Sequence, residues 1–430
     1  MKDRSDTRSG CSEYRGLSRR GFLGRGALAA AAAASAPAWL PRVALARAGA
    51  GGGSAKDTLV YVFLRGGMDG LTTVVPHGDP ELYIARPTLA IQPPGMTNGA
   101  VDLDGFFGLA PAAQPLATPY FNGHLAFVHA SGSTDPTRSH FESFQHIEFG
   151  IPEQPLGSQT TGWLARHLST TPPAVSVPLR GAAVSDVLPL TLTGAPGTLP
   201  IADYEDFGFP GDPTSEASRK AAIRRMYDPA AEPLGPAGLS TLETIDLLET
   251  LDFAGATPGG GAVYPATDFA RSLQNTATLI KADVGVEVVM LELGGWDLHS
   301  EEGPVDGVMA ALLDDLTRSL EAFYLDVLAQ IDGITLVVQS EFGRRVAENA
   351  SAGFDHGHGN VMMVLGGHVA GAQVHGSWPG LAPANLDQGD LAVTTDYRDV
   401  LAEILAKRLG NTQLDQVFPG HVPSFPNVIT

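Results

Sequence analysis

The chain has 430 residues, 43% of them apolar, and a net charge of -20 from 27 Lys and Arg against 47 Asp and Glu. The apolar fraction is ordinary for a globular protein and excludes wholesale disorder, and a single cysteine excludes a disulfide-stapled scaffold. A surface this acidic repels phosphate backbones and anionic lipid headgroups, so we expect no nucleic-acid or membrane-surface partner and regard cations as more natural ones.

The first 46 residues differ in charge from the rest of the chain. They carry a net charge of +5, whereas the remaining 384 residues carry -25. A twin arginine, Arg19-Arg20, precedes an Ala-rich stretch over 27–36 and an Ala-x-Ala site at 44–46. This pattern is typical of an export signal of the twin-arginine (Tat) type. The apolar stretch is too short to span a bilayer, so we predict a cleaved Tat signal peptide over 1–46 and no membrane anchor.

Export by this route predicts a periplasmic or extracellular protein, with the Tat translocase as a partner during export. The only cysteine, Cys11, lies within the predicted signal. The mature chain therefore has no disulfide, thiolate ligand, cysteine nucleophile or cysteine-derived formylglycine. Residues 47–55 (RAGAGGGSA) read as a flexible linker.

Residues 56–430 are predicted to form a single α/β domain. The clearest strands are continuous apolar runs at Thr58–Leu64, Val286–Leu293 and Ile334–Gln339, with weaker candidates at Leu125–His129 and Val361–Leu365. A long amphipathic helix between the second and third runs makes a βαβ unit. The predicted fold is a doubly wound, mainly parallel sheet with helices on both faces. Residues 150–283 read as a helical insertion that covers one face of the sheet, or as a cap beside the site.

Three of these strands end in tight loops that carry an acidic residue: Asp69, Asp297 and Glu341. One acidic residue after a strand is most often a helix N-cap or a turn former. Three of them at the carboxyl edge of one parallel sheet, where ligands bind in this fold class, favour a functional site.

A histidine-rich loop, Asp355-His356-Gly357-His358, follows the third strand. Alternating His and Gly cannot continue a helix, and an H-x-H pair can place two imidazoles on one metal. With the three carboxylates, and with His299 two residues after Asp297, these rings suit a divalent cation such as Zn, Mn, Mg or Ca. The alternative is a solvated glycine-rich loop.

A last constellation follows the Leu125–His129 strand, where Pro136 marks the start of a helix. Thr134 and Ser139 offer hydroxyls near the helix N-terminus, which favours anions and lowers the cost of an alkoxide. Arg138 is suited to clamp a phosphate or sulfate. The same residues also fit a simple N-cap cluster, and the local sequence does not separate the two interpretations.

Together these residues resemble a family of exported bacterial proteins called domain of unknown function 1501, which is grouped with the alkaline phosphatase and sulfatase superfamily. The matching stretches span most of the mature chain. In order, they are Leu64–Gly70, Thr137–Phe141, Gly294–His299, Ser340–Arg344 and Asp355–His358.

The resemblance implies an alkaline phosphatase-like fold with one or two metal ions and a hydroxyl or formylglycine nucleophile that attacks a phosphate or sulfate ester. Asp69 resembles the first-strand metal aspartate, and Asp297 with His299 resembles an Asp-x-x-x-His pair. Glu341 resembles the Asp of Asp-His-Gly, and His356 or His358 would match the last metal histidine.

The nucleophile has two candidate positions by resemblance. Thr134-x-Pro136-x-Arg138 is similar to the sulfatase Cys/Ser-x-Pro-x-Arg motif, whereas Ser139-His140 belongs to the family's own signature. The chain departs from the superfamily in three ways: the Asp297–His299 spacing is two residues short, Phe342 stands where a histidine ligand would sit, and no cysteine is available for formylglycine.

The leading hypothesis is therefore an exported metal-dependent hydrolase of a sulfate or phosphate ester. Its predicted ligands are Asp69, Asp297, His299, Glu341, His356 and His358, and its predicted catalytic residues are Thr134, Arg138, Ser139 and His140. The substrate would be a small-molecule or glycan ester. The alternative is a non-catalytic secreted binding or assembly protein that keeps the fold.

Overall fold

The computed structural model describes residues 57–155, 157–173, 177–205, 207–229 and 234–430. The predicted signal peptide over 1–46 and the linker over 47–55 lie outside these residues. None of the described helices is both long enough and apolar enough to cross a membrane.

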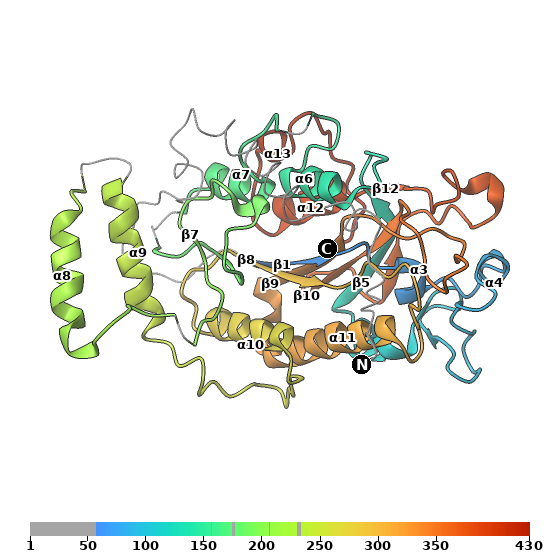
Figure 1. The fold of residues 1–430 in the computed structure, drawn as a ribbon, viewed down its shortest axis with the longest axis horizontal. Helices are drawn as coiled ribbons and strands as arrows, with labels where there is room; N and C mark the ends of the chain where they lie inside the picture. Colours follow the sequence, from blue (N-terminus) through green and yellow to red (C-terminus); the bar gives the residue numbers. More distant parts are fainter. Residues whose placement is uncertain (1–56, 156, 174–176, 206, 230–233) are drawn as a thin grey trace, which may run out of the picture.

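A nine-stranded sheet forms the centre of the structure (Figure 1). Eight of its strands lie in the order β11 (Gln373–His375), β5 (Leu125–Gly132), β10 (Asn360–Gly366), β9 (Ile334–Ser340), β1 (Thr58–Arg65), β8 (Val288–Gly294), β6 (Gly181–Ala183) and β7 (Thr198–Pro200). The ninth, β12 (Thr395–Asp396), pairs with β5. Strand β10 runs antiparallel to β5 and β9, and the other pairings are parallel.

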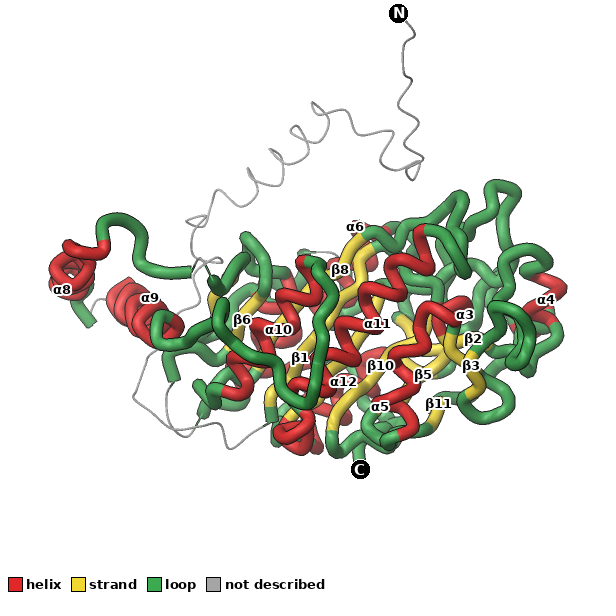
Figure 2. The backbone as a smooth tube through the Cα atoms, turned by 90° about the horizontal axis from the view of Figure 1, so that it is seen from below, coloured by secondary structure: helices red, strands yellow, loops and turns green. Residues whose placement is uncertain are grey.

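Helices cover both faces of this sheet (Figures 1 and 2). Successive side chains of β1 point to opposite faces. Val60 and Val62 belong to one hydrophobic core, with α10 (Asp268–Lys281) and α11 (Val308–Asp326). Leu59 and Tyr61 belong to a second core, with α6 (His140–Phe149), α7 (Trp163–Thr170), α12 (Tyr397–Lys407) and α13 (Leu414–Val417). The predicted doubly wound, mainly parallel α/β fold is confirmed.

Residues 150–283, expected to be helical, also extend the sheet. They supply β6 and β7 at its edge, and α10 on one face. The helices α8 (Glu216–Met226) and α9 (Leu234–Leu248) lie beyond the β7 edge (Figure 1). Lys220 is the only buried residue of α8.

Shorter elements complete the fold. A small antiparallel sheet pairs β4 with β2 and β3. The remaining elements are α3 (Gly70–Thr73), β2 (Val74–Val75), α4 (Glu81–Ala85), β3 (Val101–Asp102), β4 (Gly108–Leu109), α5 (Ala117–Phe121) and the 3-10 turns η3 (Pro111–Leu116), η4 (Leu190–Leu192), η5 (Pro213–Ser215), η6 (Leu328–Gly333) and η7 (Pro383–Asn385).

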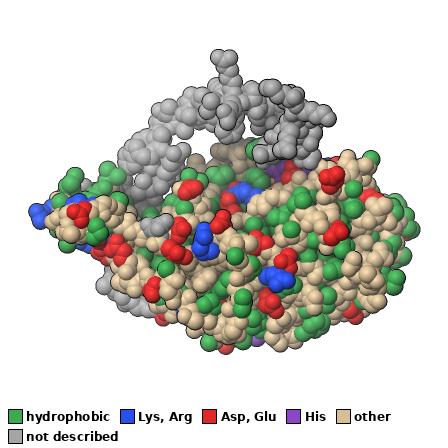
Figure 3. All heavy atoms as spheres, turned by 60° about the horizontal axis from the view of Figure 1, so that its bottom comes forward, with side chains coloured by type: hydrophobic (Ala, Val, Ile, Leu, Met, Phe, Trp, Pro, Cys, Tyr) green, Lys and Arg blue, Asp and Glu red, His purple; other side chains and the backbone are tan. Residues whose placement is uncertain are grey.

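Acidic side chains form no single patch on the face seen in Figure 3, where Asp and Glu are scattered over the surface. The acidic charge of this face therefore marks no site.

The pairing of β1 brings three loops together. Strand β1 lies between β8 and β9 and is parallel to both, with Arg65 level with Gly294 and Leu64 level with Ser340. The carboxyl ends of the three strands therefore meet at one edge of the sheet, which is where ligands bind in such folds.

Candidate metal centre

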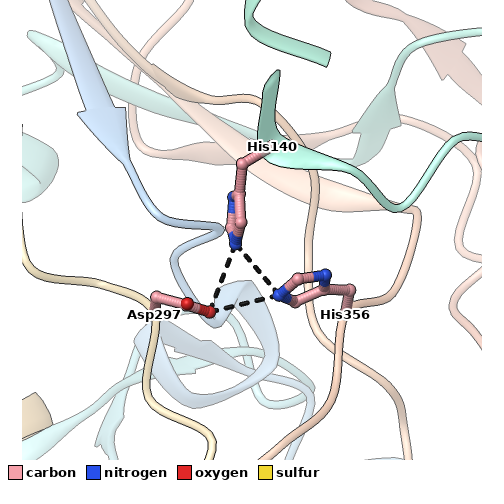
Figure 4. Close-up of side chains that lie close together, drawn as sticks. All are labelled: His140, Asp297 and His356. Carbon is pink, nitrogen blue, oxygen red and sulfur yellow. Dashed lines mark hydrogen bonds and ion pairs between the residues drawn. The ribbon is translucent and has the colours of Figure 1, made fainter. Parts of the chain in front are cut away.

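Three side chains from distant parts of the sequence converge at this edge (Figure 4). His140 is the first residue of α6, Asp297 follows β8, and His356 precedes β10. The Nε2 atom of His140 lies 2.9 Å from Nε2 of His356. The Oδ1 atom of Asp297 lies 3.2 Å from the first ring and 3.1 Å from the second. Among the residues that the structure describes, this is the one group of potential ligands that converges so closely.

A fourth side chain, His299, contacts the same cluster. Its Nε2 atom lies 3.0 Å from Oδ1 of Asp297 and 2.9 Å from Nε2 of His356. The centre therefore offers three imidazole nitrogens and one carboxylate oxygen. His140 and His356 are buried or nearly so, whereas Asp297 and His299 are about a fifth to a quarter exposed, at 21% and 25%. The centre thus opens to solvent on the side of these two residues.

The hydrogen bonds on the far side of each ring fix which nitrogen carries the proton. Nδ1 of His356 lies 2.6 Å from the backbone carbonyl of Arg138, which can only accept. Nδ1 of His140 lies 2.6 Å from the Glu341 carboxylate, and Nδ1 of His299 lies 3.3 Å from the Asp355 carboxylate. Each Nδ1 is therefore the donor, so in the neutral rings the three Nε2 lone pairs face the cluster.

This pattern is the one that metal-binding histidines show. A ligating imidazole almost always donates its other N–H to a carboxylate or a carbonyl, which sets the tautomer and the ring orientation. Three lone pairs and a carboxylate oxygen facing one another repel unless a cation lies between them. The residues present therefore fit a divalent cation.

The charges of the cluster agree with this fit. Burial would raise the pKa of Asp297, but its contacts with His140, His299, His356 and Arg344 outweigh burial and hold that pKa well below its ordinary range. Burial would lower the pKa of His140, but Asp297 and Glu341 raise it to about 9. Without a metal, a proton on His140 would be the cation that the carboxylates attract.

Glycines and one buried tryptophan shape the loops that carry the ligands. Gly66 has φ +120, and a Cβ there would lie 2.7 Å from the backbone nitrogen of Asp297. A Cβ on Gly357 would lie 2.4 Å from the backbone carbon of Arg344. Trp296 is buried, and its Nε1 donates to the carbonyl of Leu293 over 3.0 Å. These contacts require close backbone approach and hold Asp297 against the end of β1.

Arg344 ties the strand-end loops to one another. It is buried, and its guanidinium donates to the carbonyls of Gly67, Trp296 and Phe354 over 2.6, 3.0 and 3.0 Å. It also donates to Oδ1 of Asp297 over 2.8 Å. Arg344 therefore positions the carboxylate and is already satisfied by protein partners.

Three of the predicted ligands lie apart from the cluster. Asp69 caps the N-terminus of α3 and pairs with buried Arg86. Glu341 accepts from His140, from the backbone N–H of Gly66 and from the hydroxyl of Ser340, so it supports a ligand and does not face the cluster itself.

His358, the third of these predicted ligands, also points to partners outside the cluster. Its Nδ1 lies 2.9 Å from Oδ2 of Asp387, and its Nε2 lies 2.9 Å from the carbonyl of Ser133. Because both ring nitrogens face oxygen acceptors, His358 links two loops.

The predicted catalytic residues separate in the same way. Ser139 is the N-cap residue of α6, next to His140, and its side chain does not cap the helix. Thr134 is exposed and donates to Glu153 over 2.7 Å. Arg138 pairs with Asp390, and its side chain is 35% exposed. His140, predicted for catalysis, lies instead among the candidate ligands.

Sequence analysis assigned no role to Asp355, which directs the ring of His299. Asn349 donates to the carbonyl of His299 over 2.9 Å and to Oδ1 of Asp355 over 3.2 Å. Asp355 directly precedes His356 in sequence, and this position beside a candidate ligand could have marked it as a supporting residue. Nothing in the sequence around Asn349 marks it.

Comparison with known proteins gives a family model and distant structural neighbours. A model described as "Protein of unknown function (DUF1501)" matches residues 215–416. The matched segment includes Asp297, His299, Glu341 and His356. His140 lies before its first residue and is not part of it. No curated protein matches the sequence.

The solved structures that align include a sulfatase and an alkaline phosphatase. Ps i-CgsB in complex with k-i-k-neocarrahexaose aligns over 85% of this chain and 74% of its own, at 10% identity and a TM-score of 0.37. A protein in the alkaline phosphatase superfamily from Vibrio parahaemolyticus aligns over 75% and 63%, at 10% identity and a TM-score of 0.35. The alkaline phosphatase of the Antarctic bacterium TAB5 aligns over 73% and 92%, at 7% identity and a TM-score of 0.29.

Glu341 provides a test of the candidate centre. Glu341→Ala removes the acceptor that orients His140, so we expect the affinity for Zn²⁺ to fall about 10- to 100-fold. Competition with a chromophoric chelator measures this affinity. Glu348→Ala is the matched control, because Glu348 bonds Thr88 at an exposed site. Equal Zn²⁺ affinity in the two folded variants would contradict the assignment.

Proposed function

We propose that the protein is an exported, metal-dependent hydrolase that acts on a sulfate or phosphate ester. The observation that carries this proposal is the convergence of three imidazole Nε2 atoms and one carboxylate at the carboxyl edge of the sheet. In this proposal His140, Asp297, His299 and His356 hold a divalent cation. When bound, such a cation polarises the ester and lowers the pKa of an attacking hydroxyl or water.

Ser139 is the better placed of the two candidate nucleophiles. Its hydroxyl stands at the N-terminus of α6, is not used to cap the helix, and belongs to the residue next to His140. The helix N-terminus stabilises negative charge on an oxygen there. The hydroxyl of Thr134 is engaged by Glu153 on an exposed segment, so we assign Thr134 no part in the reaction.

Arg138 is the side chain best placed to meet an anionic substrate. It directly precedes Ser139, and its backbone carbonyl orients His356. Its guanidinium is held from one side by the buried carboxylate of Asp390 and is partly exposed on the other. In this proposal the partly exposed guanidinium, on the residue before the nucleophile, offsets charge on the non-bridging oxygens of the ester as it develops.

A screen of nitrophenyl sulfates and phosphates with the Zn²⁺- or Mn²⁺-loaded protein tests the function. We expect turnover of at least one ester, and loss of about 100-fold or more of kcat in Asp297→Ala, which removes an anionic ligand. If Ser139 is the nucleophile, Ser139→Ala loses turnover but keeps the metal.

The control is Thr134→Ala, which we expect to keep the activity of the unaltered protein. If the metal-loaded, folded protein is silent on every ester, the proposal fails. The alternative, a secreted binding or assembly protein that keeps the fold, would then be favoured.

Export is proposed from residues 1–46 alone, which lie outside the described residues. We expect the full chain to reach the periplasm or the medium, and Arg19→Lys with Arg20→Lys to retain it in the cytoplasm, because the arginine pair is the feature the Tat pathway reads. Cell fractionation measures this, with Arg15→Lys and Arg25→Lys as the control. Export of the Arg19/Arg20 variant at the control level would contradict the proposal.

A further inference from the structure

We propose that the centre takes one divalent ion of the Zn²⁺ and Co²⁺ class in preference to Ca²⁺ or Mg²⁺, and that Arg86 neutralises Asp69, in the loop after β1, so that no second ion binds there. This inference rests on the proposed metal centre and specifies its ion. It is argued from the donor set, from the saturation of Asp69, and from what fills the space beside the imidazoles.

The donor set favours a borderline transition metal. Three of its four donors are imidazole nitrogens, which suit Zn and its neighbours, whereas Ca²⁺ and Mg²⁺ are bound almost entirely by oxygen. Five separations between donor atoms span 2.9 to 3.2 Å: those from Oδ1 of Asp297 to the three Nε2 atoms, and those from Nε2 of His356 to Nε2 of His140 and His299.

Asp69 has no oxygen left for a metal. Its Oδ2 accepts from Arg86 over 2.5 Å and from the hydroxyl of Thr72 over 2.6 Å. Its Oδ1 accepts from Arg86 over 3.1 Å and from the backbone N–H of Leu71 over 3.2 Å. The carboxylate therefore already has its cation.

Arg86 is held in this place from every side. It is 1% exposed, and its Nε donates to the carbonyl of Val346 over 2.9 Å. Its guanidinium lies 3.8 Å from the centre of the Phe354 ring and also donates to the carbonyl of Arg345 over 3.0 Å. Displacing it would leave a buried guanidinium without its carboxylate partner, so we expect Arg86 to stay paired with Asp69 when a metal is present.

The space beside the imidazoles is filled by carbon. Phe342 is buried, and its ring centre lies 4.8 Å from that of His140 and 5.0 Å from that of His356. A side chain with a metal-binding atom at this position would face the cluster, but the phenyl ring of Phe342 has no such atom.

Glu302 is the remaining buried carboxyl in this region. Its Oε2 has no hydrogen-bond partner, and burial together with the charge of Asp69 raises its pKa well above the ordinary range. Burial and the charge of Asp69 thus disfavour an anionic carboxylate at Glu302, and with it an anionic ligand for a second cation.

Metal titration of chelator-stripped full-length protein tests the inference. We expect one Zn²⁺ or Co²⁺ per chain by elemental analysis, intense visible absorption of four-coordinate Co²⁺, and Zn²⁺ binding at least 100-fold tighter than Ca²⁺ or Mg²⁺. His299→Ala should weaken Zn²⁺ binding at least tenfold. Two ions per chain, or Ca²⁺ or Mg²⁺ within tenfold of Zn²⁺, would overturn the inference.

Asp69→Asn separates this inference from one in which Asp69 is a ligand. We expect the variant to keep one ion per chain with unchanged Zn²⁺ affinity while its melting temperature falls. If this variant does not fold, the double variant Asp69→Asn with Arg86→Met removes both charges, and we expect it also to keep one ion per chain. Loss of an ion in the folded single or double variant would contradict us.

The two proposals fail separately. One tightly bound Zn²⁺ without any ester hydrolysis would support this inference and contradict the proposed hydrolase. Ester hydrolysis by a protein that holds two ions would support the hydrolase and contradict this inference.

Discussion

The candidate centre depends on the hydrogen bonds behind its three histidines. The Arg138 carbonyl, the Glu341 carboxylate and the Asp355 carboxylate each accept from one Nδ1, so each ring directs its Nε2 lone pair inward. No single one of these bonds creates a site. Because the three rings come from α6, the loop after β8 and the loop before β10, the bonds succeed together only when the strand-end loops are held in register.

That register comes from the sheet and from two buried arginines. The parallel pairing of β1 with β8 and β9 brings the loops to one edge, and Arg344 then links their carbonyls to Asp297. Arg86 performs a similar task at Asp69. Buried guanidiniums are costly to desolvate, and the cost is offset only where carbonyls and carboxylates meet nearly every donor. Hydrogen bonds from the two guanidiniums therefore hold the loops around the centre together, in addition to apolar packing.

The sequence predicted the frame of this arrangement better than its details. The apolar runs of β1, β8 and β9 predict buried parallel strands. Neighbouring parallel strands have their carboxyl ends at the same edge of the sheet, so the shared edge could be predicted as well. Asp297 was predicted as a ligand from its strand-end loop, His299 from its place two residues after Asp297, and His356 from the His-x-His loop. Which carboxylate faces the centre depends on partners that are remote in sequence: Asp69 is taken by Arg86, and Glu341 turns to the Nδ1 of His140. One amino-acid sequence does not show which side chains pair across such distances. His140 was predicted for catalysis because its approach to Asp297 and His356 was equally invisible in the sequence.

Anomalous diffraction from a crystal grown with Zn²⁺ tests the central claim most directly, since it locates the ion without reference to activity. Our account predicts one strong peak at the zinc edge, about 2.0–2.1 Å from Nε2 of His140, His299 and His356 and from Oδ1 of Asp297. A peak beside Asp69 or His358, or none among the three imidazoles, would contradict it.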